Sequence, residues 1–128
     1  MEQLDSEKYI SLTTYTKDGR AKPTPVWFAS LNGEGMCIVT EKDSWKVKRI
    51  QRNPAVELAV CDSRGAISSE ASSIGGRAKI VGRNTSEFES TNLALTRKYG
   101  LFYRLFSLVA RIRGKESCAI FVTLDTTA

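Results

Sequence analysis

Thr40, Ser44 and Lys46 lie close together in an unusually basic stretch of the chain, TEKDSWKVKRIQRNP at residues 40–54. Two hydroxyl groups and an ammonium group at this spacing can all donate hydrogen bonds to one anion. A helix that begins near Trp45 would add the unpaired N–H groups and the partial positive charge of its first turn. The stretch therefore predicts a phosphate-binding turn between a strand that ends at Thr40 and this helix.

Two other interpretations of the same stretch stay open at this point. The basic residues are good helix formers and could simply be the solvated face of an amphipathic helix, with Val47 and Ile50 facing the core. They could also neutralise the backbone of a nucleic acid. Gln51 and Arg52 give little support for base contacts, and the chain lacks an aromatic-rich RNA-binding strand motif.

The whole chain is short and basic, and it contains no histidine. It has 128 residues, of which 41% are hydrophobic, and its formal net charge is +5. This length predicts a single domain over residues 1–128, and the charge favours anionic partners. Without histidine the chain cannot form a Ser-His-Asp triad, a Cys-His pair or a histidine-containing metal site, and we expect no metal.

Cys37, Cys61 and Cys118 are far apart in the sequence, and each lies in a strand-like run. Three cysteines without a CxxC pair are typical of reduced, buried thiols in a cytoplasmic protein. The N-terminal residues MEQLDSEKYI lack the apolar core of a signal peptide, and no run is long enough to span a membrane. We therefore expect a cytoplasmic protein without a membrane partner.

Alternating apolar residues predict strands that are separated by turn residues. Asp18-Gly19 marks a hairpin between the first two, and Pro23 and Pro25 place the second at a sheet edge or beside a cavity. The six expected strands cover residues 9–15, 21–30, 36–40, 55–62, 76–83 and 117–125. Hairpin connections and the excess of strands predict a mainly β fold of the α+β kind. We expect a six-stranded antiparallel sheet, curled into a small barrel with flanking helices.

Three helical segments accompany the strands. The first covers residues 45–52, and the second begins with a capping box of Ser86 and Glu89 and stops at Gly100. The third segment, residues 101–113, is expected to cover the barrel, and membrane-surface binding is the alternative for it. Its apolar stripe consists of Leu101, Leu105, Leu108 and Ile112.

Three segments of the chain resemble the pyridoxamine 5′-phosphate oxidase-like family of split β-barrel proteins. They are YISLTTYTKDGRAKPTPVWF, VTEKDSWKVKRIQRNPAVELAVCD and GRAKIVG, which cover most of residues 9–82. The sequence looks closest to the branch that binds the deazaflavin coenzyme F420. The resemblance implies an FMN-binding type of split barrel and a homodimer with its cofactor sites at the subunit interface.

By this resemblance, Thr40, Ser44 and Lys46 hold the cofactor phosphate, next to a strand end that includes Val39. Trp45 stands where the oxidase pattern has an arginine, and Arg49 or Lys48 could restore that charge from the same helix. The strand beside the flavin ring corresponds to Pro25, Val26, Trp27 and Phe28. Thr24 and Ala29 replace basic residues of the oxidase pattern, which argues against pyridoxamine-phosphate oxidase activity itself.

The resemblance further implies an oxidoreductase that binds coenzyme F420 or FMN and transfers hydride to or from a small organic substrate. The basic residues, including RIRGK at 111–115, favour F420, whose phosphate carries a tail of glutamates. Because the cofactor carries the reaction, no catalytic side chain is assigned, although Tyr103 is considered as an acid. A non-catalytic carrier of the cofactor is the alternative function, and a nucleic-acid partner is not expected.

Overall fold

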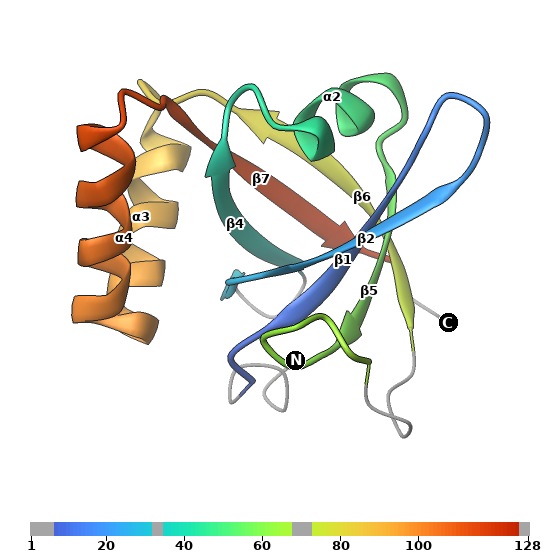
Figure 1. Ribbon diagram of the computed structural model, residues 1–128, viewed down its shortest axis with the longest axis horizontal. Coiled ribbons are helices and arrows are strands. Elements are labelled where there is room, and N and C mark those ends of the chain that lie inside the picture. Colours follow the sequence, from blue (N-terminus) through green and yellow to red (C-terminus); the bar gives the residue numbers. More distant parts are fainter. Residues whose placement is uncertain (1–6, 32–34, 68–72, 126–128) are drawn as a thin grey trace.

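The computed structural model describes residues 7–31, 35–67 and 73–125 of the chain. Within these ranges one antiparallel sheet curls round a core, and helices lie against its outside (Figure 1). The seven strands are β1 Ile10–Tyr15, β2 Ala21–Val26, β3 Ala29–Leu31, β4 Gly35–Glu41, β5 Ala55–Val60, β6 Ile74–Val81 and β7 Ser117–Leu124. The helices are α2 Trp45–Arg52, α3 Ser86–Tyr99 and α4 Leu101–Ile112.

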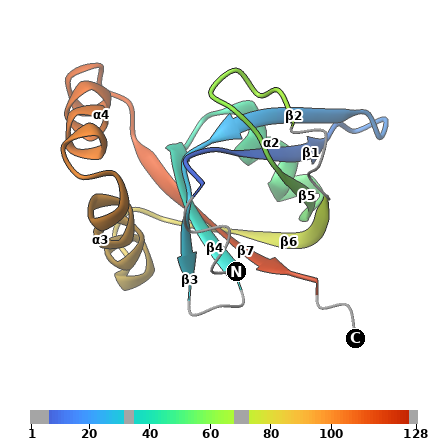
Figure 2. The same ribbon diagram turned by 90° about the horizontal axis from the view of Figure 1, so that it is seen from below.

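The two edge strands of the sheet are neighbours in the sequence, and this determines the shape of the barrel. The strand order is β2-β1-β5-β6-β7-β4-β3, and every neighbouring pair is antiparallel. Trp27 and Phe28 alone join β2 at one edge to β3 at the other, so the sheet must curl until its edges approach each other. In the described part of the chain β2 and β3 do not pair, which makes the barrel split (Figures 1 and 2).

The sequence predicts six strands, and the structure has seven because the expected strand at 21–30 breaks in two. Its first half pairs with β1 and its second half with β4. At the break, the backbone N–H of Phe28 donates to Tyr99 Oη at 3.0 Å, and the Tyr99 hydroxyl lies 3.1 Å from the Phe28 carbonyl. The Tyr99 side chain therefore replaces the hydrogen bonds of a neighbouring strand where the chain crosses from one edge of the sheet to the other. The two prolines lie in edge strand β2, as predicted.

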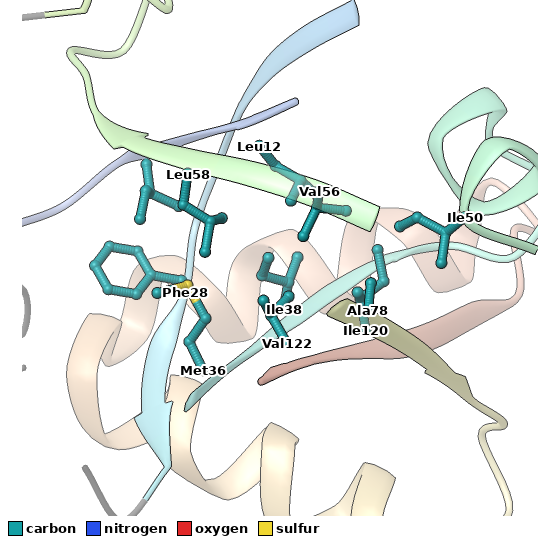
Figure 3. Close-up of a cluster of buried hydrophobic side chains, with 11 residues drawn as sticks. Leu12, Phe28, Met36, Ile38, Ile50, Val56, Leu58, Ala78, Ile120 and Val122 are labelled. Atoms are coloured by element: carbon teal, nitrogen blue, oxygen red, sulfur yellow. The ribbon is translucent and has the colours of Figure 1, made fainter. Parts of the chain in front are cut away.

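Alternating apolar side chains from the strands fill the barrel (Figure 3). On α2, Val47 and Ile50 are buried as predicted, and Ile50 packs against this core from the end of the barrel. The buried residues of the core are Ile10, Leu12, Phe28, Met36, Ile38, Ile50, Val56, Leu58, Ala78, Ile120 and Val122. The core thus fixes the ends of β2 and β4, where the predicted site residues lie.

The cap of α3 is Thr85, so the predicted capping position at Ser86 is wrong by one residue. Thr85 Oγ1 accepts a hydrogen bond of 3.2 Å from the N–H of Phe88. An N-cap needs an extended backbone, which Thr85 has with φ −116° and ψ 156°, whereas Ser86 is already helical. The predicted stop at Gly100 is confirmed, because this residue has a φ of 61°.

The helix α4 packs mainly on α3 and only weakly on the sheet. Its one buried side chain in the structure is Tyr103, which lies against α3 and β4 residues in a second apolar cluster. The predicted stripe is exposed to solvent instead, so the expectation that it covers the barrel is wrong. In the described part of the chain, no helix is both long enough and apolar enough to cross a membrane.

Candidate functional site

The turn from β4 to α2 brings Thr40, Ser44 and Lys46 together, as the sequence predicts. Thr40 is the last residue but one of β4, Ser44 is the N-cap of α2, and Lys46 is the second residue of the helix. The Lys46 side chain folds back over the turn, and its Nζ donates a hydrogen bond of 3.1 Å to Thr40 Oγ1. The ammonium group is therefore held beside the strand end and does not extend freely into solvent.

Ser44 occupies the capping position of α2, yet its hydroxyl does not cap the helix. Its Oγ is buried and has no hydrogen-bond partner among the residues that the structure describes. A buried hydroxyl left in this state costs on the order of 1–3 kcal/mol, so it calls for an explanation such as a ligand. An anion beside Ser44 would accept hydrogen bonds from its hydroxyl, from Lys46 and from the unpaired N–H groups of the first helical turn.

The charge of Lys46 is partly desolvated. Burial lowers the pKa of Lys46 below the ordinary 10.5, because the protein disfavours the charged form. Attraction by Glu41 opposes this shift, and repulsion by Arg49 adds to it. A cation in such surroundings interacts more strongly with an anion than an exposed lysine does, since less water screens the pair.

A cavity of about 520 Å³ opens beside this turn, between β2 and the helices α3 and α4. Thr40, Glu41, Ser44 and Lys46 form its polar end. The rest of the wall is mostly apolar and consists of Tyr9, Pro25, Val26, Trp27, Val39, Leu95, Tyr103 and Phe106. The volume is in the range of small-molecule sites, roughly 300–1,000 Å³. A polar end that contains the Lys46 ammonium group and an apolar wall together suit a ring system that carries a phosphate.

The aromatic wall at Trp27 is built by packing and does not need a ligand. The Trp27 ring stacks on Tyr99 with centroids 4.7 Å apart and an interplanar angle of 11°, and Phe106 lies 5.7 Å away. The Tyr99 hydroxyl is held at the crossing by Phe28 and lies 2.8 Å from the carbonyl oxygen of Lys8. Burial raises the pKa of Tyr99 to about 12, so its phenol remains a protonated structural group.

Three of the ten predicted cofactor residues lie outside the cavity. Phe28 is fully buried in the barrel core, where the Lys98 ammonium lies 3.5 Å from its ring centroid. Trp45 is 69% exposed, and it shares a second groove of about 320 Å³ with Arg49. This basic groove is lined by Thr16, Arg20, Lys22, Trp45, Lys48, Arg49 and Arg52. Consecutive helical residues point about 100° apart, which is why Trp45 and Lys46 face different spaces.

The cavity also contains residues that the sequence did not indicate: Tyr9, Glu41, Leu95 and Phe106. Glu41 directly follows Thr40, one residue beyond the predicted end of the strand. Leu95 and Phe106 reach the cavity through the packing of α3 and α4, far along the chain. No local pattern marks such contacts.

Tyr103 and the three cysteines, which also carry ionisable groups, are buried. The Tyr103 hydroxyl donates to Asn92 Oδ1, and burial raises the pKa of Tyr103, so its phenol stays protonated. The three cysteines are free and buried, as predicted, and burial raises the pKa of each thiol. The described ranges hold no group of His, Cys, Asp or Glu side chains suited to a metal ion.

Fold and cavity together define a split-barrel protein whose cavity joins a polar end to a mostly apolar wall. A family model described as pyridoxamine 5′-phosphate oxidase matches residues 1–113. The chain therefore belongs to this family, which confirms the resemblance found in the sequence. The comparison with curated proteins returned no match.

Several solved structures share the fold at low sequence identity. HutZ, described as the heme storage protein of Vibrio cholerae, has a TM-score of 0.74 and 14% identity, covering 98% of this chain and 88% of that chain. The conserved hypothetical protein Rv2991 of Mycobacterium tuberculosis has a TM-score of 0.72 and 18% identity, covering 98% and 78%. A structure described as F420 reductase has a TM-score of 0.65 and 22% identity, covering 98% and 93%. At these identities the likeness shows the fold alone.

Proposed function

We propose that the chain binds coenzyme F420 or FMN in the cavity and acts as an oxidoreductase that transfers hydride to or from a small organic substrate. The observation that carries this proposal is the buried Ser44 hydroxyl, which has no partner in the described part of the chain. It lies with Thr40 and Lys46 at the polar end of a cavity of suitable volume. Membership in the pyridoxamine 5′-phosphate oxidase family supports the same class of ligand.

The residues of the cavity suit the two parts of such a cofactor. The phosphate would be held by Ser44, Lys46 and the N–H groups of the first turn of α2. The ring would lie along Pro25, Val26 and Trp27, which form an apolar wall. When bound, the cofactor supplies the hydride chemistry, and the protein binds it, orients it and excludes water.

We favour F420 over FMN because the helix that contributes Lys46 to the cavity also lines a basic groove. Trp45 and Arg49 lie in this groove, one residue and three residues along α2 from Lys46. Five of its seven lining residues are basic and none is acidic, which suits a tail of carboxylates. FMN has no such tail and would leave the groove unused. Phe28 would support the ring wall from the core without contacting the cofactor.

We also propose that the chain forms a homodimer, in which the second copy helps to cover the cavity. The support is the resemblance to a family of homodimers and the small size of one 128-residue chain. Free, buried thiols fit a cytoplasmic protein, which we propose as well.

Heme is the second candidate ligand, because the heme storage protein HutZ shares the fold. Protein ligands to heme iron are usually His, Cys, Met or Tyr. This chain has no histidine, and its three cysteines do not line the cavity. Of the two lining tyrosines, Tyr103 already donates to Asn92, which leaves Tyr9. The cavity therefore favours a phosphate-bearing cofactor over heme.

The test is titration of the purified protein with oxidised and reduced FMN, with F420 and with hemin. Submicromolar binding of FMN or F420 is the expected result. Tight binding of hemin alone would contradict the proposal. Hydride transfer from the bound cofactor to quinones and enones would then distinguish an enzyme from a non-catalytic carrier, which would bind the cofactor without turnover.

A further inference from the structure

The outward side of α4 is a continuous apolar surface. At 3.6 residues per turn its exposed apolar side chains fall on an arc of about 160°. These residues, which we call the α4 face, are Leu101, Phe102, Leu105, Phe106, Leu108, Val109 and Ile112. Leu101 and Ile112, at the two ends of the helix, are 80% and 75% exposed. Single exposed leucines are ordinary, but a contiguous apolar face of this kind marks an interaction site.

The position of α4 leaves this face accessible. Tyr103 points the opposite way and is buried against α3. Both views show α4 beside α3 at the outer edge of the molecule (Figures 1 and 2). A flat surface could therefore approach the whole length of the helix without meeting the barrel.

The charged residues of the segment 101–115 are all positive. Arg104 and Arg111 lie along one edge of the apolar arc, and Arg113 and Lys115 follow the end of the helix. All four side chains are exposed. No acidic residue occurs between positions 101 and 115, and none of the four cations forms an ion pair within the described residues. An apolar face with cationic borders is the pattern of a helix that lies in a membrane interface.

We propose that the α4 face binds the surface of an anionic lipid bilayer, with the helix lying in the interfacial plane. The apolar side chains enter the boundary of the acyl chains, and Arg104, Arg111, Arg113 and Lys115 contact the anionic headgroups. The helix does not cross the bilayer. The proposal does not rest on the proposed cofactor, although Phe106 at one edge of the α4 face also lines the cavity. It replaces the expectation that the chain has no membrane partner.

A second copy of the chain is a less suitable occupant for the same face. Two α4 faces packed together would bring eight positive charges close to each other, four from each copy, with no acid on either helix to balance them. Anionic headgroups supply the missing negative charge over the whole face. A bilayer also has no fixed shape, so it needs no complementary pocket.

The experiment measures co-sedimentation of the full chain with vesicles, without added cofactor. Vesicles of phosphatidylcholine alone are compared with vesicles that also contain phosphatidylglycerol, at low and high salt. We expect binding to the anionic vesicles that falls as salt rises, and at least about tenfold weaker binding to neutral vesicles. Absence of binding to the anionic vesicles would overturn the proposal.

Two pairs of variants locate the binding surface. Leu105→Glu, on the α4 face, is compared with Leu93→Glu on α3, since the two leucines are 57% and 53% exposed. We expect about tenfold weaker binding for the first variant and less than about twofold change for the second. The second pair consists of double variants. The variant that combines Arg104→Gln and Arg111→Gln should weaken binding more than the variant that combines Arg77→Gln and Lys79→Gln, which removes the same charge from exposed positions on β6.

Equal losses within either pair would show that binding does not occur through α4, and the proposal would be wrong. It would also be wrong if Leu105→Glu converted a dimer into a monomer while the wild-type chain did not bind vesicles. In that case the α4 face would be a contact between copies. Because both leucines are exposed, neither substitution is expected to unfold the chain, and thermal unfolding of each variant checks this.

Discussion

Ser44 is the residue whose hydrogen bonding the proposed ligand should change most. A serine at an N-cap normally accepts a hydrogen bond from the helix, and its replacement by alanine costs about 0.5–2 kcal/mol. Ser44 makes no such bond, and its buried hydroxyl has no partner in the described part of the chain. The side chain is thus positioned for something other than stability.

We predict that Ser44→Ala leaves the free energy of unfolding of the unliganded protein unchanged or slightly raises it, while weakening cofactor binding. The matched control is Thr85→Ala, which removes a side chain that does cap its helix. It should cost about 1 kcal/mol and leave the affinity for cofactor intact. Urea unfolding and ligand titration of both variants check this, and a stability loss in Ser44→Ala as large as in Thr85→Ala would show that Ser44 has an ordinary capping role.

Lys46 predicts a pH dependence of cofactor binding. Its lowered pKa means that it loses its proton at a lower pH than an ordinary lysine. Cofactor binding favours the charged ammonium, so affinity should be highest below the pKa of Lys46 and should fall as pH rises through it. For the unliganded protein the sign is opposite, because the unfolded state binds more protons and stability therefore rises with pH in this window.

Titrations with cofactor from pH 7 upward check this prediction. The control is Lys46→Arg, since arginine stays charged throughout this range. Its affinity should not fall with pH in the same window. An identical decline in both proteins would mean that another group is responsible.

At the scale of elements, the crossing from β2 to β3 is the feature that makes the barrel and supports the cavity wall. Tyr99 satisfies the backbone of Phe28 at this crossing and stacks on Trp27. We predict that Tyr99→Phe destabilises the protein by about 1–3 kcal/mol, because it leaves a buried N–H without a partner. The control Tyr15→Phe removes a hydroxyl whose hydrogen bond to Glu57 is exposed, and it should change stability by less than about 0.5 kcal/mol.

Urea unfolding of the two tyrosine variants decides between these expectations. Equal effects of Tyr99→Phe and Tyr15→Phe would show that the crossing does not depend on the Tyr99 hydroxyl. A loss confined to Tyr99→Phe would confirm that α3 holds the two sheet edges together.

Most elements could be predicted from the sequence because local patterns determine them. Alternation gave the strands, Asp18-Gly19 the first hairpin, and Asn53-Pro54 the end of α2. The break at Trp27 and Phe28 could not be predicted, since both halves of the segment have strand-like composition. It exists because the halves pair with β1 and β4, and sequence alone does not say which strands become edges.

The same difference between local and distant causes explains how much of the site was found. Thr40, Ser44 and Lys46 were correctly placed together because a strand end, a turn and a helix start fix them locally. Leu95 and Phe106 were missed because they enter the cavity through tertiary packing of α3 and α4. The α4 stripe was assigned to the barrel because amphipathicity identifies an apolar face but not what covers it.

At the scale of the whole molecule, the proposed homodimer gives a direct prediction. Sedimentation equilibrium of the protein with bound cofactor should give a mass of twice the 14.2 kDa of one chain. The expectation rests on a cavity that one small chain does not fully enclose. A monomer at every concentration, still able to bind the cofactor tightly, would show that one chain forms the complete site.

The most direct test of the central claim compares phosphorylated and phosphate-free ligands. FMN and riboflavin, and F420 and its phosphate-free deazaflavin, are titrated into the wild type, Lys46→Ala and Lys48→Ala. The last variant removes the same charge from the groove side of α2. We predict that the wild type and Lys48→Ala bind the phosphorylated form of at least one pair about tenfold or more tightly, and that Lys46→Ala loses this preference. Equal affinity for both forms in the wild type would contradict the assignment of a phosphate site to the turn between β4 and α2.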